Sequence, residues 1–160
     1  MITMWQLVTL LFCFIFSASL AQSKFPHAQA HAHNDYEHAK PLWEALENGF
    51  ISIEADVHLV KGKLLVSHGQ PKQNASPLSD LYLTPLDSLL TYNADKIYPG
   101  YQGSLYLMID CKTEAVSTFR AIQNELANYK RLLCSSSYCP VKIFISGNRA
   151  LDTIMKNGYQ

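Results

Sequence analysis

The chain has 160 residues, of which 48% are hydrophobic, and its 13 basic side chains balance 13 acidic ones. This composition is typical of a globular protein and excludes an intrinsically disordered one. The neutral charge balance gives no reason to expect nucleic acid as a partner.

The N-terminal segment has the composition of an export signal. Residues 7–16 form a short apolar run, and Ser19, Leu20 and Ala21 suit cleavage by signal peptidase. We expect residues 1–21 to be removed and residues 22–160 to be exported to the periplasm or the cell exterior. An uncleaved N-terminal membrane anchor is the alternative, because no Lys or Arg precedes the apolar run. That run is nevertheless short for a stable membrane span.

The next part of the chain predicts a strand, a helix and a hairpin. Residues 28–34 alternate like a short strand, and residues 40–50 place apolar side chains at helical spacing before Gly49. Residues 51–57 (ISIEADV) are the clearest strand, with one apolar and one polar face. Residues 58–69 predict a hairpin that turns at Lys61 and Gly62. Residues 70–83, rich in Pro, Ser and Asn, predict an irregular insertion.

Helices and strands alternate in the rest of the chain. Thr84 is expected to cap a helix with Pro85 in its first turn. Residues 103–112 predict a strand, residues 113–133 the longest helix and residues 141–147 a further strand, after which Asn148 caps a helix ending at Lys156. Cys134 and Cys139 either form a disulfide in an exported protein or remain free thiols, as Cys111 does.

This alternation predicts parallel strands with helical crossovers, either in an open α/β sheet or in a TIM-type (β/α) barrel. A barrel has eight units, and the chain supplies about four of them. We therefore expect residues 22–160 to form one domain, the N-terminal half of a (β/α) barrel.

Polar side chains two residues apart occur near three strand ends: His31 and His33, Glu54 and Asp56, and Asp110 and Lys112. Such pairs share one face of a strand, and in a parallel α/β protein the strand ends meet at one rim, where active sites are built. Each carboxylate pair alone is more typical of a solvated strand face, and His31 or His38 alone of a loop. The three pairs together favour a functional site. His58, at the start of the hairpin, stays outside the predicted set.

The donor types of this set predict a chemistry. The three carboxylates are hard oxygen ligands that suit Mg²⁺ or Ca²⁺, and a cation would offset their mutual repulsion. Lys112 would hold an anionic substrate oxygen, while His33 and His68 would carry protons. Together they predict cleavage of a phosphodiester, in which the metal neutralises the phosphate charge.

The order and spacing of these residues resemble the glycerophosphodiester phosphodiesterase family, within the superfamily of phospholipase-C-like phosphodiesterases that includes sphingomyelinase D. The matching motifs are AHN at 32–34, EAD at 54–56, SHG at 67–69 and DCK at 110–112. The resemblance implies a TIM-type barrel and a small-molecule phosphodiester substrate. It also implies His33 and His68 as the catalytic pair, and a divalent cation held by the three carboxylates, which are Glu54, Asp56 and Asp110.

Three departures from the family pattern concern the substrate. Asn34 stands where glycerophosphodiesterases carry an Arg that would grip phosphate, and we expect Asn34 to contact the substrate. Gly69 stands where an Asp is common, and Asp110 stands where a Glu is usual, as on the sphingomyelinase D side. The segments HAHNDY and ADVHLVKGKLLVSHG also resemble a branch named for altered inheritance of mitochondria in fungi. The expected substrate is a glycerophosphodiester or a related lipid-headgroup diester.

Two other interpretations stay open. A truncated or degenerate member would bind a phosphate ligand or a partner without turnover, since the matched residues end at position 112. A metal-free lyase of the phosphatidylinositol-specific type would require another explanation for the carboxylates. An open half-barrel would also expose strand edges, which predicts self-association.

Overall fold

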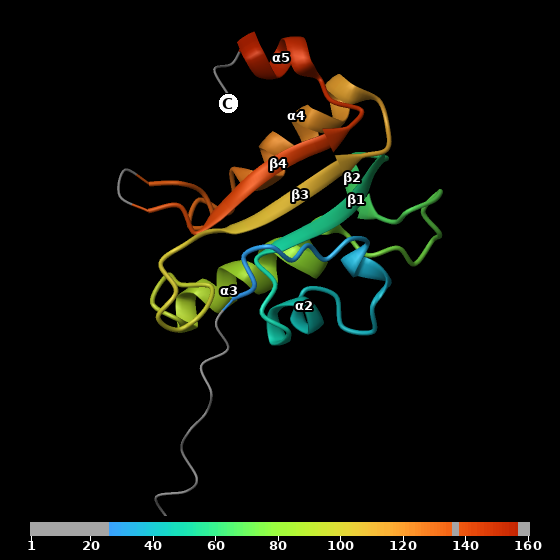
Figure 1. The fold of residues 1–160 in the computed structure, drawn as a ribbon. Helices are drawn as coiled ribbons and strands as arrows, with labels where there is room; N and C mark the ends of the chain where they lie inside the picture. Colours follow the sequence, from blue (N-terminus) through green and yellow to red (C-terminus); the bar gives the residue numbers. More distant parts are fainter. Residues whose placement is uncertain (1–25, 136–137, 157–160) are drawn as a thin grey trace, which may run out of the picture.

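The structure, a computed structural model, describes residues 26–135 and 138–156, so the expected export signal at 1–21 lies outside the described residues. The described part contains one sheet with the strand order β2-β1-β3-β4. The strands are β1 (Ser52–Val60), β2 (Lys63–Val66), β3 (Leu105–Cys111) and β4 (Val141–Gly147). Strands β1, β3 and β4 are parallel, and β2 returns antiparallel to β1. The mixed α/β architecture is confirmed, but the sheet is open and forms no closed barrel within these residues (Figure 1).

Helical segments connect the strands. They are the 3₁₀ turn η1 (Asp35–Glu37), α2 (Trp43–Glu47), the π-helical turn η2 (Ser79–Leu83), α3 (Thr84–Tyr92), α4 (Ala115–Leu126) and α5 (Leu151–Lys156). Helix α4 packs against β1, β2 and β3. Figure 1 shows α2 and α3 near β1, and α5 beyond β4 at the top. In the described ranges, no helix has the length and apolar character needed to cross a membrane.

The core follows from the period-two alternation of the strands. In β3, Leu105, Leu107, Ile109 and Cys111 are buried, and the residues between them are half-buried. The register pairs Ile53 with Leu107 and Ala55 with Ile109, so the apolar face of β1 continues that of β3. The predicted strands at 51–57, 103–112 and 141–147 and the hairpin at 58–69 are thereby confirmed. The opposite face of the same strands carries the acidic side chains of β1 and β3 together with Tyr106, Met108 and Phe144.

The predicted strand at 28–34 is wrong in extent. This segment forms only isolated bridges beside β1, from His27 to Phe50 and from Ala32 to Ile53. The Ala32 N–H donates to the Ser52 carbonyl (2.8 Å), and the Ala32 carbonyl accepts from the Glu54 N–H (3.0 Å). Pairing stops where Asn34 adopts a left-handed backbone (φ 50°) and η1 begins. The segment still runs parallel to β1, as a first strand would.

Two helix starts differ from the prediction. Residues 79–83, expected to be irregular, form η2, which continues directly into α3. Thr84 therefore has helical backbone angles and does not cap α3; its hydroxyl contacts the Tyr129 hydroxyl (2.9 Å). Pro85 has no N–H for the turn before it, which explains the irregular helical bonding at this junction.

The later helices are shorter than predicted. Helix α4 ends at Leu126 instead of residue 133, because the chain turns so that Leu132 is fully buried and its carbonyl accepts from the first residue of β4. Asn148 does not cap α5, which begins at Leu151; its side-chain amide donates to the Thr113 carbonyl (3.1 Å).

The cysteines follow one of the two predicted alternatives. Cys134 and Cys139 form a disulfide. Cys111 is a buried free thiol, and burial raises its pKa to about 11. A thiol in this state is a core side chain and not a nucleophile.

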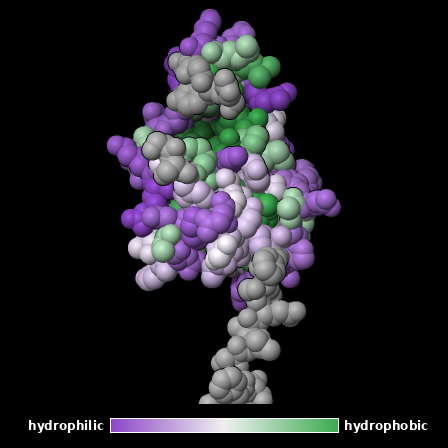
Figure 2. All heavy atoms as spheres, turned by 60° about the vertical axis from the view of Figure 1, so that its left-hand side comes forward, coloured by the Kyte–Doolittle hydropathy of each residue, from purple (hydrophilic) through white to green (hydrophobic). Residues whose placement is uncertain are grey.

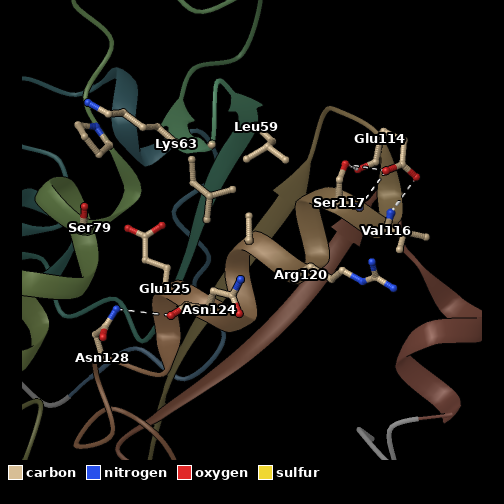
Figure 3. Close-up of a pocket in the computed structure, with 14 residues that line it drawn as sticks. Leu59, Lys63, Ser79, Glu114, Val116, Ser117, Arg120, Asn124, Glu125 and Asn128 are labelled. Carbon is tan, nitrogen blue, oxygen red and sulfur yellow. Dashed lines mark hydrogen bonds between the residues drawn. The ribbon is translucent and has the colours of Figure 1, made fainter.

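A groove of about 830 Å³ lies between α4 and the β1–β2 hairpin (Figure 3). It is lined by Leu59 and Leu64 from the hairpin and by polar side chains of α4, among them Glu125. Burial raises the pKa of Glu125 despite its hydrogen bonds with Ser79. Leu59 belongs to the odd-numbered, helix-covered face of β1, so the groove lies on the other face of the sheet from Glu54 and Asp56.

Candidate functional site

The parallel register brings the predicted carboxylates together. Asp56 of β1 pairs with Asp110 of β3, which in turn pairs with Ser146 of β4. Glu54 lies two residues before Asp56 and therefore on the same face of β1. One carboxylate oxygen from each acidic residue lies within 4.8 Å of one from each of the other two. Three negative charges thus gather on one face of the parallel strands, with Asp56 and Asp110 one residue before the parallel pairing of β1 and β3 ends.

These carboxylates do not form a solvated strand face. Glu54 is 7% exposed and Asp56 is 1% exposed, so the interpretation that an E-x-D strand pair is solvated is wrong here. Both faces of β1 are buried, because the segment around Ala32 and Asn34 runs alongside it and contacts Glu54. Burying several carboxylates is unfavourable unless cations or hydrogen bonds compensate their charge.

Lys112 provides part of that compensation. Its ammonium contacts Asp56 Oδ2 (3.0 Å) and donates to Asp110 Oδ2, while the Ser146 hydroxyl donates to Asp110 Oδ1 (2.8 Å). Burial by itself would raise the pKa of Asp110, but the hydrogen bonds from Lys112 and Ser146 outweigh it and lower that pKa. Burial likewise opposes the charge of Lys112, and the hydrogen bonds with Asp110 and Asp56 raise its pKa overall. Asp110 and Lys112 are therefore an ion pair at neutral pH.

The two predicted proton carriers, His33 and His68, each contact one of the buried carboxylates. His33 Nε2 contacts Glu54 Oε2 (3.3 Å), and His68 Nδ1 contacts Asp56 Oδ2 (3.0 Å). The side chains of His33 and His68 are 70% and 64% exposed. Each imidazole thus rests on a different buried carboxylate and leaves most of its ring open to a ligand.

The remaining histidines of this region have other environments. His31 Nδ1 contacts the Ser52 hydroxyl (2.8 Å), and His38 Nδ1 contacts Glu44 Oε2 (3.5 Å) at the surface. His58 is buried, and its ring nitrogens have no hydrogen-bond partner in the part of the chain that the structure describes. Within this part of the chain, none of the three forms a hydrogen bond or ion pair with a carboxylate of the cluster, which separates them from His33 and His68.

The loop that carries His33 has an anchor that sequence reasoning missed. Asp35 is fully buried, and its Oδ2 accepts from the Leu42 N–H (2.6 Å) and the Tyr82 hydroxyl (2.9 Å). Burial and the neighbouring Asp35 raise the pKa of Tyr82, so its hydroxyl stays a donor. The HND motif at residues 33–35 could have indicated this role of Asp35, because an Asp can accept the N–H groups of a following turn. Nothing in the sequence indicates that Tyr82 on η2 is its partner.

Asn34 and Tyr36 complete the loop beside the carboxylates. The Asn34 N–H donates to Glu54 Oε2 (3.2 Å), and the Tyr36 hydroxyl donates to Asn34 Oδ1 (2.9 Å). Burial and the neighbouring Asp56 carboxylate raise the pKa of Tyr36. The structure therefore places the predicted Asn34 next to Glu54, and adds Tyr36, which stands two residues after Asn34 and was not predicted.

The donor set fits a hard divalent cation. All three acidic ligands offer oxygen, which Mg²⁺ and Ca²⁺ prefer, and one ammonium leaves the three carboxylates with excess negative charge. Asp56 Oδ1 is buried and has no hydrogen-bond partner among the described residues. Such an orphaned acceptor costs free energy unless a cation or a water satisfies it.

Comparison with known proteins identifies a family that matches this chain. The family model for an AIM6-like phosphodiesterase domain matches residues 21–159. Two curated fungal proteins called altered inheritance of mitochondria protein 6 are similar to the chain. The one from Lachancea thermotolerans is 27% identical over 159 aligned positions, covering 82% of this chain and 37% of the relative. The one from Kluyveromyces lactis is 38% identical over 66 positions, covering 39% of this chain and 16% of the relative. The chain therefore spans less than half the length of these relatives, and no solved structure matches it.

Proposed function

This chain belongs to the AIM6-like phosphodiesterase domain family, and we propose that it carries the catalytic residues of a divalent-metal-dependent phosphodiesterase. The observation that supports this most directly is the layered site: three buried carboxylates lie within 4.8 Å of one another, and two exposed imidazoles rest on two of them. The proposed substrate is a glycerophosphodiester or a related lipid-headgroup diester. This substrate would bind at the cluster as a small anionic ligand.

Glu54, Asp56 and Asp110 would hold Mg²⁺ or Ca²⁺. When bound, such a cation neutralises phosphate charge and polarises the phosphoryl group. Lys112 already lies against two of these carboxylates and would also bind an anionic phosphate oxygen. The carboxylates and the ammonium thus prepare a site with fixed charges that need no rearrangement when charge develops on the phosphate.

The two histidines would transfer protons on either side of a phosphorus atom. His33 is attached to Glu54 and His68 to Asp56, two residues further along β1. A strand rises about 3.3 Å per residue, so the backbones of Glu54 and Asp56 are about 7 Å apart, while oxygens of their carboxylates lie within 4.8 Å of one another. In-line displacement places the attacking and leaving oxygens on opposite sides of phosphorus. One imidazole would take a proton from the attacking group, and the other would give a proton to the leaving oxygen.

We also propose that the sheet is the first part of a (β/α) barrel. Three parallel strands with the carboxylates near their carboxyl ends match the side on which such barrels bind ligands. The disulfide between Cys134 and Cys139 supports the proposed export after cleavage at Ala21, because such bonds persist in oxidising compartments.

A second function is a phosphate-binding domain without turnover. The observation that favours it is the position of Lys112, whose ammonium contacts both Asp56 and Asp110 and offsets part of their charge. A cluster held in this way would bind an anion through Lys112 and the imidazoles alone. The two functions differ in their dependence on a divalent cation.

Hydrolysis of bis(p-nitrophenyl) phosphate by the full chain tests the proposal. We expect turnover that requires Mg²⁺ or Ca²⁺, stops on chelation, and falls by at least about 100-fold in Glu54→Gln and in His33→Ala, as is typical when an acid-base group is removed. His31→Ala is the matched control, because His31 has the same side chain two residues away and contacts Ser52 instead of a carboxylate. Turnover that survives in Glu54→Gln and His33→Ala would refute the assignment. Phosphate binding without turnover would favour the second function.

A further inference from the structure

The side chain of Asn34 is held in one orientation by its own loop. Its backbone is left-handed, with φ 50° and ψ 39°, a conformation that Asn adopts more readily than most residues. The Glu37 N–H donates to the Asn34 carbonyl (2.9 Å) and fixes the turn. The turn brings the Tyr36 hydroxyl to Asn34 Oδ1 (2.9 Å), while the Asn34 N–H binds Glu54. The backbone of Asn34 is therefore tied to the carboxylate cluster through Glu54, and its side chain is tied to Tyr36.

The hydrogen bond from Tyr36 decides which end of the carboxamide is available. A hydroxyl has one hydrogen to donate, and the 2.9 Å contact directs it at the oxygen of Asn34, with the Asp56 carboxylate as a second acceptor near the same hydroxyl. A flipped carboxamide would place an NH₂ group opposite that donor and lose the bond. No other described residue is a hydrogen-bond partner of Asn34 Nδ2, so its two N–H donors are the unused polar groups at the edge of the cluster.

We propose that Tyr36 is a positioning residue that holds the Asn34 carboxamide with its NH₂ group toward the substrate phosphate. The inference rests on the proposed function, and it names the residue that sets the orientation of the predicted substrate contact. Asn34 then supplies a neutral donor pair where a phosphate oxygen meets the cluster, and Lys112 supplies the charge. A neutral donor adds binding without adding a charge that competes with a cation for Glu54.

The role of Tyr36 rests on a fixed turn. Asp35 lies between the two residues, is fully buried, and is bound by the Leu42 N–H and the Tyr82 hydroxyl. Tyr36 is itself half-buried and packs against the hydrophobic core. The aromatic ring therefore remains in place without its hydroxyl, and Tyr36→Phe removes the hydrogen bond to Asn34 and the contact of the hydroxyl with the Asp56 carboxylate. The Asn34→Ala background separates these two effects.

The experiment compares Tyr36→Phe with Tyr129→Phe in the full chain. Tyr129 is the matched control, because its hydroxyl also makes one side-chain hydrogen bond, to Thr84 (2.9 Å), away from the carboxylates. We expect Tyr36→Phe to raise the KM for bis(p-nitrophenyl) phosphate about tenfold with kcat nearly unchanged, as for the loss of a ground-state hydrogen bond to a charged group. Asn34→Ala should raise KM at least as much. Adding Tyr36→Phe to Asn34→Ala should have no further effect.

Two readouts separate this inference from the proposed function. The first is the affinity for inorganic phosphate with Mg²⁺ present, which should weaken about tenfold in Tyr36→Phe and stay unchanged in Tyr129→Phe. The second is the NMR signal of the Asn34 NH₂ group, which should shift in Tyr36→Phe without substrate.

The inference is overturned if Tyr36→Phe keeps the wild-type KM and phosphate affinity while the wild type hydrolyses the diester. An equal rise of KM in the Asn34→Ala background also overturns it, because Tyr36 would then act on something other than Asn34. If no variant hydrolyses the diester but phosphate affinity falls only in Tyr36→Phe and Asn34→Ala, the proposed function fails and the positioning role stands.

Discussion

Replacing Lys112 by Met would leave the three carboxylates without their ammonium. At 4.8 Å, the separation within which the carboxylate oxygens lie, two like charges repel by about 3.5 kcal/mol at an effective dielectric constant of about 20. Removing one partner of a buried ion pair costs about 3 to 5 kcal/mol. The lower end applies here, because the Lys112 side chain is 27% exposed. We therefore expect Lys112→Met to lower the free energy of unfolding by about 3 kcal/mol when a chelator is present.

Binding of a divalent cation should restore part of the free energy of unfolding that Lys112→Met loses. A ligand at about 100 times its Kd stabilises the folded state by about 2.7 kcal/mol, and the more negative cluster of Lys112→Met should bind Mg²⁺ or Ca²⁺ more tightly than wild type does. Urea unfolding of both proteins with chelator and with millimolar cation measures the difference.

Lys142→Met is the control for this comparison. Lys142 is an exposed lysine on β4 that lies over the ring of Tyr106, and its loss should cost about 1 kcal/mol or less with no cation dependence. Equal stability of Lys112→Met and wild type in chelator would refute the buried, mutually repelling cluster. A deficit that cations leave unchanged would refute the cation site.

Three further predictions concern regions around the site. Hydrogen bonds from Ser117 and the first amides of α4 lower the pKa of Glu114 from 4.5 to about 2, so its stabilisation is present above pH 4.5 and is lost as the pH falls toward 2; Glu114→Gln should flatten the melting temperature over that range. Tyr82→Phe should cost about 1.5 to 3 kcal/mol in urea unfolding, because it removes a donor from the buried Asp35 carboxylate. Phe144 on β4 is half exposed, and Figure 2 shows apolar side chains gathered in the upper part of the molecule; we expect concentration-dependent self-association in sedimentation and a shift toward monomer in Phe144→Ser.

The strands and the acidic cluster were predictable because they depend on local periodicity. The alternation in ISIEADV and LYLMIDC fixes which side chains share a face, and parallel pairing then brings Asp56 and Asp110 side by side. His68 was predictable from the short hairpin that precedes it. The extent of burial of Glu54 was not predictable, because it depends in part on the segment around Ala32, which lies alongside β1 and is not encoded in the strand itself.

The missing parts depend on contacts far apart in the sequence. Ser146 is one small polar residue in a strand, and its hydrogen bond to Asp110 follows only from the register between β3 and β4. Asp35 has the sequence context of a loop residue, and its partner Tyr82 is 47 residues away on η2. Residues 79–83 contain no helical period over a full turn, so the π-helical turn before Pro85 could not be predicted.

Two separate structural elements, the sheet and the loop at residues 33–37, position the residues of this site. The carboxylates are placed by the sheet, through the pairing of β1 with β3 and the contacts of Lys112. His33 and Asn34 are placed by a loop that Asp35 anchors to η2 and to the start of α2. The only described hydrogen bonds or ion pairs of these two residues with the cluster are those to Glu54. Loosening the contact between Asp35 and Tyr82 should therefore displace the His33 imidazole and the Asn34 carboxamide while the acidic cluster keeps its geometry. Loss of turnover in Tyr82→Phe with unchanged cation affinity would show that the loop and the sheet position their residues independently.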